Sequence, residues 1–475
     1  MSANTNDNPS LIAGHAKYVQ GAVSSALGYE TGEATKSAAV DEMKRASEQN
    51  SSQQPAQNNV LGTIEKKAGE LVGCEGMAEE GTQRLPTSGR PIHFTLRQQG
   101  RRNRRNTIKT NHASVTMTIT TEATTLLGTK NPILLAGMGR VAGPPLAAAV
   151  SNAGGLGVIG GVGYTPKQLR SLCQELKSLL SSPELPFGVD LLIPQVGGNA
   201  RKTNYDYTKG GLDEMVDIII EEGAKVFVSA VGVPPKAVVD KLHRHGVLYG
   251  NMIGHPKHIK KCGDLGVDII IAQGGEGGGH TGEIPTSVLI PACVSAAKHY
   301  KSPITGNPPL VVAAGGIATG AGVAAALMLG ASAVWIGTRF VTATEAGATK
   351  RDKELMVAAG FDATLKSTIW TGRPLRHLKT TYTEEWETKR RAELEEIQGR
   401  GKLAIDVEMD RLAKEGKLTE EIEDLSHCRP AGVVAALCDK AGQSAGEIVR
   451  EMVGEAEVSL RSASRFLGGR REARL

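Results

Sequence analysis

The chain has 475 residues, of which 40% are hydrophobic, so it is long and apolar enough to form a large core with appendages. Its net charge of +5 is too small to define a partner. Its six cysteines show no CxxC or zinc-like spacing, and no apolar run reaches the ~18 residues of a membrane span. No secretory signal begins the chain, so we expect a soluble, cytoplasmic protein without a metal site.

Residues 1–96 differ in composition from the rest of the chain. They are poor in long aliphatic side chains, and glycines recur seven residues apart at Gly14 and Gly21 and at Gly62 and Gly69. Residues 11–84 resemble CsbD-like stress-response proteins in their small residues and lysines. The composition also fits a disordered tail, so we predict a helical or disordered extension.

A basic stretch, RQQGRRNRR, occupies residues 97–105. Clustered arginines are compatible with nucleic-acid binding or nuclear import. No aromatic residues are interleaved with them, which favours a solvated linker over residues 97–116 and makes nucleic acid an unlikely partner.

Residues 117–360 alternate between short apolar runs and helical patterns. The runs are continuous rather than alternating, as expected for strands buried on both faces. Eight such units in about 240 residues predict a (β/α)8 TIM barrel rather than an open doubly wound sheet. The predicted strands are 132–138, 156–161, 186–194, 225–232, 247–254, 267–274, 309–316 and 332–340. Residues 361–475 are rich in helical charge pairs and predict a helical cap.

Glycine-rich turns follow the predicted strands at the end of a barrel where active sites lie. Gly315 and Gly316 follow the seventh strand, and Gly337 and Thr338 follow the eighth. Barrels commonly bind phosphate after these two strands, so we expect a phosphate-bearing ligand here. After the first strand, the small residues Ala136–Met138 offer a surface for a flat ring.

The loop QGGEGGGH, residues 273–280, supplies an ionisable group. Gln273 would face the barrel mouth, and the glycines up to Gly279 would let the backbone approach a ligand closely. An imidazole titrates near neutral pH, so we expect His280 to act as a general base without extreme tuning of its pKa.

Five segments in order, residues 137–161, 186–192, 273–282, 313–340 and 371–378, resemble the nitronate monooxygenase family, formerly called 2-nitropropane dioxygenases. The resemblance spans residues 118–380 and implies an FMN-dependent TIM barrel. It implies that His280 is catalytic. It also implies that the cofactor contacts Ala136, Gly137, Met138, Asp190, Gln273, Gly279, Gly315, Gly316, Gly337 and Thr338.

Asp190 departs from the family pattern, because many relatives carry Asn in the segment that here reads PFGVD. A carboxylate near a flavin would disfavour the anionic reduced form unless it is solvated or paired. Residues 195–211 form a longer insert than a simple connecting loop, and we expect a lid over the substrate.

The resemblance implies oxidation of nitronates by O₂, through FMN, to carbonyl compounds and nitrite. Two alternatives remain open. One is an FMN-dependent NAD(P)H reductase of enoyl thioesters or quinones, although no dinucleotide-binding fingerprint is visible. The other places the function in the N-terminal residues, as a stress or nucleic-acid-binding module with an inactive barrel. The physiological substrate and the oligomeric state remain open.

Overall fold

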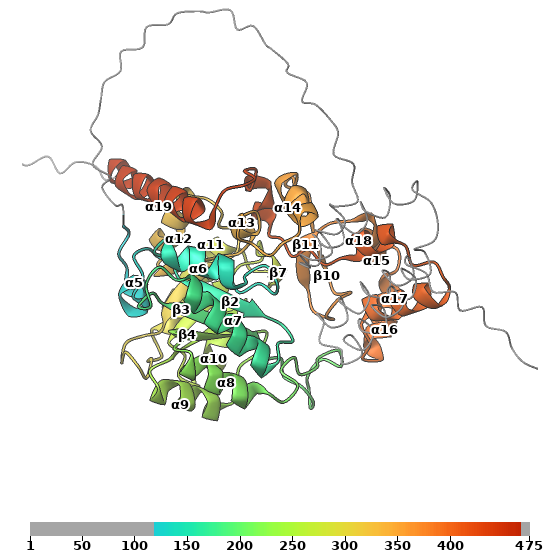
Figure 1. Cartoon of the computed structure of the whole chain (residues 1–475), viewed down its shortest axis with the longest axis horizontal. Coiled ribbons are helices and arrows are strands. Elements are labelled where there is room, and N and C mark those ends of the chain that lie inside the picture. Colours follow the sequence, from blue (N-terminus) through green and yellow to red (C-terminus); the bar gives the residue numbers. More distant parts are fainter. Residues whose placement is uncertain (1–117, 467–475) are drawn as a thin grey trace, which may run out of the picture. The chain divides into compact units, whose positions relative to one another are not determined.

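The computed structural model describes residues 118–466. The predicted N-terminal extension and basic linker lie outside these residues. An eight-stranded parallel barrel forms the centre of the described chain (Figure 1). Its strands are β1 (Ile133–Leu135), β2 (Gly157–Gly161), β3 (Phe187–Leu192), β4 (Val226–Ala230), β5 (Leu248–Ile253), β6 (Ile269–Gln273), β8 (Leu310–Ala314) and β9 (Ala333–Ile336).

The barrel closes between its first two strands. The sheet runs in the order β1-β9-β8-β6-β5-β4-β3-β2, and Leu134 forms a parallel bridge with Leu156 just before β2. Two backbone hydrogen bonds of 2.9 Å join Leu156 to Ile133 and Leu135 across this seam. The predicted TIM barrel is therefore confirmed, with each strand inside its predicted segment.

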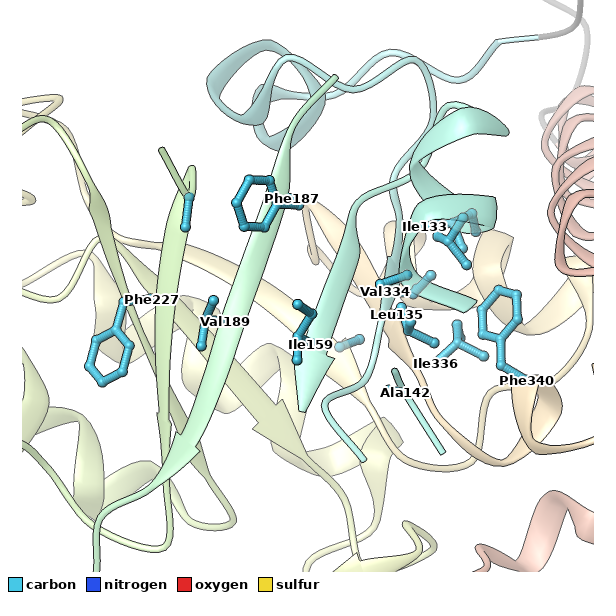
Figure 2. Close-up of a cluster of buried hydrophobic side chains, with 14 of the residues drawn as sticks. Ile133, Leu135, Ala142, Ile159, Phe187, Val189, Phe227, Val334, Ile336 and Phe340 are labelled. Atoms are coloured by element: carbon cyan, nitrogen blue, oxygen red, sulfur yellow. The ribbon is translucent and has the colours of Figure 1, made fainter. Parts of the chain in front are cut away.

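Alternate residues of the strands point to the two faces of the barrel wall. One cluster fills the barrel interior and includes Leu134, Val158 and Trp335. Their chain neighbours, such as Leu135, Ile159 and Ile336, face the surrounding helices (Figure 2). Both faces are buried, which explains why the strands read as continuous apolar runs.

The short helix α5 (Glu122–Leu127) packs against the barrel's interior cluster, close to the start of β9. Its Ala123 and Leu127 belong to the interior cluster, and Thr121 caps it and donates to Ser332 O. The connecting helices are α6 (Pro144–Asn152), α7 (Pro166–Leu179), α8 (Leu212–Glu221), α9 (Lys236–Arg244), α10 (Ile259–Gly263), preceded by the 3₁₀ helix η1 (Pro256–His258), α11 (Thr286–Ala297) and α12 (Gly320–Met328).

The eighth helix of the barrel comes from the end of the described chain. The sequence predicts one helix over residues 342–360, but only α14 (Lys350–Val357) is regular there, after the short α13 (Thr338–Val341). Helix α14 packs near the 3₁₀ helix η2 (Val433–Leu437). Instead, α19 (Ala445–Ser462) packs against α12 and α6 (Figure 1). Its buried face, including Ile448 and Met452, joins the outer core.

The predicted cap is helical only in part. Residues 364–378 form the antiparallel pair β10 (Thr364–Ser367) and β11 (Leu375–Leu378), which the sequence did not indicate. Strand β11 also pairs with β7 (Gly279–His280) from the glycine-rich loop. Beyond the hairpin lie α15 (Thr381–Thr388), α16 (Arg391–Gly399), α17 (Ala404–Lys414), α18 (Glu420–Ser426) and, after α19, the 3₁₀ helix η3 (Ala463–Phe466). The predicted division of the chain into residues 1–96, 97–116, 117–360 and 361–475 stays a prediction.

Candidate active site

The first two strands end in a close backbone contact that only glycine allows. A Cβ on Gly160 would lie 2.0 Å from the backbone nitrogen of Met138. Ala136 and Met138 border Gly337, where a Cβ would meet the Ala136 Cβ at 3.4 Å and the Met138 Sδ at 3.5 Å. The structure thus brings the predicted ring surface beside the turn that follows β9.

Asp190 points into the barrel beside this surface. Its neighbours Val189 and Leu191 face the helices, and Asp190 itself is only 3% exposed. The carboxyl packs against Gly137, where a Cβ would come 2.2 Å from Oδ2, and Oδ1 has no hydrogen-bond partner among the described residues. Burial raises the pKa of Asp190 to about 7. The neutral acid is therefore well populated near neutral pH, so Asp190 need not place a full negative charge here.

The Asp190→Asn variant tests this burial through the pH dependence of stability. An ordinary Asp has a pKa of 3.8, so between pH 4 and 7 the unfolded chain releases a proton that folded Asp190 retains. This carboxyl therefore contributes stability that is lost as pH rises across this window, by up to about 4 kcal/mol. Urea denaturation at several pH values should show that the unfolding free energy of the native chain, measured relative to Asp190→Asn, falls as pH rises.

A matched control is Asp240→Asn, which removes a half-exposed carboxyl on α9 that pairs with Lys236 and has a lowered pKa. This variant should keep the native pH dependence between pH 4 and 7. If the unfolding free energies of Asp190→Asn and the native chain change equally across that window, the carboxyl of Asp190 is not buried as described.

Gln273 organises the glycine-rich loop at the end of β6. Its Nε2 donates to Gly278 O at 3.1 Å and to His280 O at 3.0 Å. Gly279 has a φ of +71°, which disfavours other residues. The loop then pairs with β11, where His280 lies opposite Leu375. His280 therefore stands on a two-residue strand rather than on the free loop that the sequence suggested.

The imidazole of His280 is held by one contact. Its Nε2 lies 2.9 Å from Thr371 Oγ1, and Nδ1 forms no hydrogen bond with the described chain. Burial, together with the charge of Arg373, lowers the pKa of His280 to about 4. The sequence predicted a value near neutrality, but it could not show this burial. The ring is thus a neutral acceptor at physiological pH, although a weaker base than a solvated histidine.

The turns after β8 and β9 meet the glycine-rich loop. Gly315 and Gly316 have φ values of +84° and +74°, and a Cβ on Gly315 would lie 2.9 Å from Gly274 O. The Thr338 hydroxyl accepts from the backbone N–H of Gly432, 3.0 Å away. These close approaches bring the predicted phosphate turns together with the segment that leads into η2.

Glu276 occupies the same region, and its carboxylate is directed at α11. Thr286 donates to it from the backbone N–H, at 3.1 Å, and from the hydroxyl, at 3.0 Å. The same hydroxyl lies 2.8 Å from Gly315 O. Glu276 therefore caps α11 and orders the turns.

The turns after β8 and β9 leave backbone donors open for a phosphate group. The backbone N–H groups of Gly316, Gly337 and Thr338 donate to no other group of the described chain, so they are free to bind an anion. The residues present thus fit a phosphate group at these turns.

All eleven predicted site residues lie at the carboxyl end of the barrel strands or in the loops that follow them. They form two groups. The first lies at the ends of β1, β3 and β9 and comprises Ala136, Gly137, Met138, Asp190 and Gly337. The second lies in or around the glycine-rich loop and comprises Gln273, Gly279, His280, Gly315, Gly316 and Thr338. The sequence missed Thr371, Arg373 and Gly432. The first two belong to the segment TGRPLRHL, which was part of the family resemblance but had no assigned role. Nothing in the sequence indicated Gly432.

Residues 118–466 contain neither a metal-binding cluster nor a membrane-spanning helix. No group of three or more His, Cys, Asp or Glu side chains there could hold a metal ion. No helix in that range is both long enough and apolar enough to cross a membrane.

The family model described as nitronate monooxygenase matches residues 120–450, well over half of the chain. This chain belongs to the nitronate monooxygenase family. It is therefore an oxidoreductase of a family that acts on small molecules, and such enzymes generally carry a flavin.

Proteins similar to this chain are named for different reactions. The chain is 32% identical to a probable nitronate monooxygenase of Staphylococcus saprophyticus, over 56% of this chain and 80% of the relative. It is 34% identical to a carboxyl-CoA dehydrogenase of Mycobacterium tuberculosis, over 58% and 71%. A nitroalkane oxidase structure from Streptomyces ansochromogenes aligns with a TM-score of 0.57 and 26% identity, covering 72% of this chain and 99% of that one.

Proposed function

We propose that this protein is an FMN-dependent nitronate monooxygenase that converts alkyl nitronates, and nitroalkanes, with O₂ to carbonyl compounds and nitrite. The observation that carries this proposal is the neutral, half-buried imidazole of His280 at the barrel mouth, together with the free backbone donors of the turns after β8 and β9. Bound FMN would supply the electron-transfer chemistry between the nitronate and O₂.

His280 is the proposed base. A nitroalkane is neutral until a proton leaves the carbon that bears the nitro group, and an unprotonated imidazole can accept that proton. Thr371 holds Nε2, which leaves Nδ1 available for a ligand. After proton transfer the imidazolium would face the nitronate anion, and this pairing favours both charged groups.

The remaining site residues would position the cofactor. Gly316, Gly337 and Thr338 would bind the phosphate through their backbone N–H groups. Ala136, Met138 and the carboxyl of Asp190 would border the ring. The side-chain amide of Gln273 is occupied by the loop through Nε2, so only its Oε1 is left for the cofactor.

A second candidate is a flavin-dependent oxidation or reduction of a thioester, supported by the identity to a carboxyl-CoA dehydrogenase. Anaerobic mixing distinguishes the two. We expect a nitronate to bleach the flavin rapidly and NADH or NADPH to bleach it slowly. Rapid bleaching by a pyridine nucleotide, with none by a nitronate, would contradict the proposed function and favour the second candidate.

A further inference from the structure

The imidazole of His280 is oriented by a hydroxyl group and not by a carboxylate. Its backbone is fixed by Gln273, whose Nε2 donates to His280 O at 3.0 Å, and by the pairing of β7 with β11. The ring itself has one polar partner in the described chain, Thr371 Oγ1, at 2.9 Å. By contrast, the ring of His243 lies 2.9 Å from the carboxylate of Asp268. The orientation of the His280 ring therefore depends on Thr371.

The other contacts of the Thr371 hydroxyl bear on which ring nitrogen carries the proton. A hydroxyl has one proton to donate and two lone pairs. The backbone N–H of Arg373 donates to Thr371 Oγ1 at 3.4 Å, and the hydroxyl can donate its own proton to Arg373 O, also at 3.4 Å. The remaining lone pair then faces Nε2 of His280, which donates to it. In this arrangement the ring proton is on Nε2, and Nδ1 keeps its lone pair.

Proton transfer favours the same arrangement. When His280 accepts a proton, both ring nitrogens carry a hydrogen, and Nε2 must then donate. A Thr371 hydroxyl that already accepts from Nε2 needs no rotation at that moment, whereas one that donates to Nε2 would have to turn over. Dipoles that are already oriented for the charged state stabilise it without a cost of reorganisation.

The turn that carries Thr371 is braced by the insert after β3. Arg201 donates from Nη1 to Gly372 O at 3.0 Å, and the Thr203 hydroxyl donates to Thr371 O at 3.4 Å. Thr203 packs so closely on Gly372 that a Cβ there would lie 2.1 Å from the Thr203 hydroxyl. The insert, which the sequence suggested as a lid, is thus anchored to this turn and holds the hydroxyl in place.

We propose that Thr371 is a positioning residue that holds His280 in the Nε2–H tautomer, so that Nδ1 is the atom that takes the proton of the substrate. In that step the C–H bond beside the nitro group breaks and its electron pair stays on the nitronate. The proton forms a bond to Nδ1, while Nε2–H stays on Thr371 Oγ1. The step rests on the proposed function, whereas the tautomer does not.

Nitrogen NMR of isotope-labelled histidine side chains tests the tautomer without any substrate. The sample is the full chain with FMN added, at neutral pH, and signals that His280→Ala lacks belong to His280. We expect the Nε2–H pattern in the native chain and in Thr371→Ser, which keeps the hydroxyl. Thr371→Val, which has a similar shape and no hydroxyl, should show a mixture of both tautomers. An Nδ1–H pattern in the native chain, or an unchanged Nε2–H pattern in Thr371→Val, would overturn the proposal.

A pair of substrates then tests the role in proton transfer. Thr371→Val should lower kcat/KM for a neutral nitroalkane about 10- to 100-fold, the effect of losing one hydrogen bond to a charged ring, and that for its preformed nitronate less than about 3-fold. Thr371→Ser should recover most of the loss. Thr388→Val, which changes an exposed threonine of α15, should leave both values unchanged.

The two measurements separate the tautomer from the proposed function. The expected NMR result without turnover of either nitro compound would retain the tautomer and reject the proposed function. An equal loss for nitroalkane and nitronate in Thr371→Val, or no recovery in Thr371→Ser, would overturn the role of Thr371 in proton transfer.

Discussion

Replacing His280 with alanine is expected to lower kcat/KM for a neutral nitroalkane about 100- to 10,000-fold, the usual contribution of a general base. A preformed nitronate has already lost its proton, so its turnover should fall less than about 10-fold. FMN binding should persist, because the imidazole makes its one polar contact with Thr371 rather than with the phosphate turns. Steady-state oxygen consumption with both forms of one compound measures the difference.

The control for this variant is His299→Ala, which removes an exposed histidine after α11. It should leave both activities at the native level. Equal loss of activity toward nitroalkane and nitronate in His280→Ala would reject the role of His280 as a base and indicate a role in binding instead.

The second large effect is expected from Gly160→Ala. The new methyl group would lie 2.0 Å from the Met138 backbone nitrogen, and a backbone atom cannot move aside as a flexible side chain does. We expect the free energy of unfolding to fall by about 3 kcal/mol. The variant should also lose FMN, because the segment from Ala136 to Met138 must shift. Urea denaturation and flavin absorbance measure these two losses.

Gly139→Ala provides a matched control in the loop after β1, next to Met138, which the Gly160 methyl group would meet. Its methyl group would come no closer than 3.9 Å to Val162, and the position is exposed. The change in unfolding free energy should stay within about 0.5 kcal/mol. A similar small effect of Gly160→Ala would contradict the close contact between the ends of β1 and β2.

The barrel could be predicted because its strands carry local signals. Each strand is a short apolar run followed by a turn residue and a helix, as in the segment Thr165–Leu179, where Thr165 caps α7 and Pro166 begins it. The eighth helix could not be assigned this way. α19 lies over 100 residues beyond β9 in the chain, and only packing against α12 and α6 identifies it as part of the barrel.

The candidate site was predictable in outline for a similar reason. In a barrel the carboxyl ends of all strands meet at one face, so glycine turns and a histidine after strands imply a common site. The properties of these groups depend on contacts across the fold. Thr371 reaches His280 from 91 residues away, and the pKa of Asp190 rises only because the closed barrel buries it. Neither effect is encoded in the local sequence.

A visible absorption spectrum of the purified full-length chain, followed by mass analysis of the released cofactor, tests the central claim most directly. The claim is that the barrel mouth binds FMN beneath His280. We predict a flavin spectrum and stoichiometric FMN, either retained on purification or taken up when FMN is added. A colourless protein that does not take up added FMN would contradict the account.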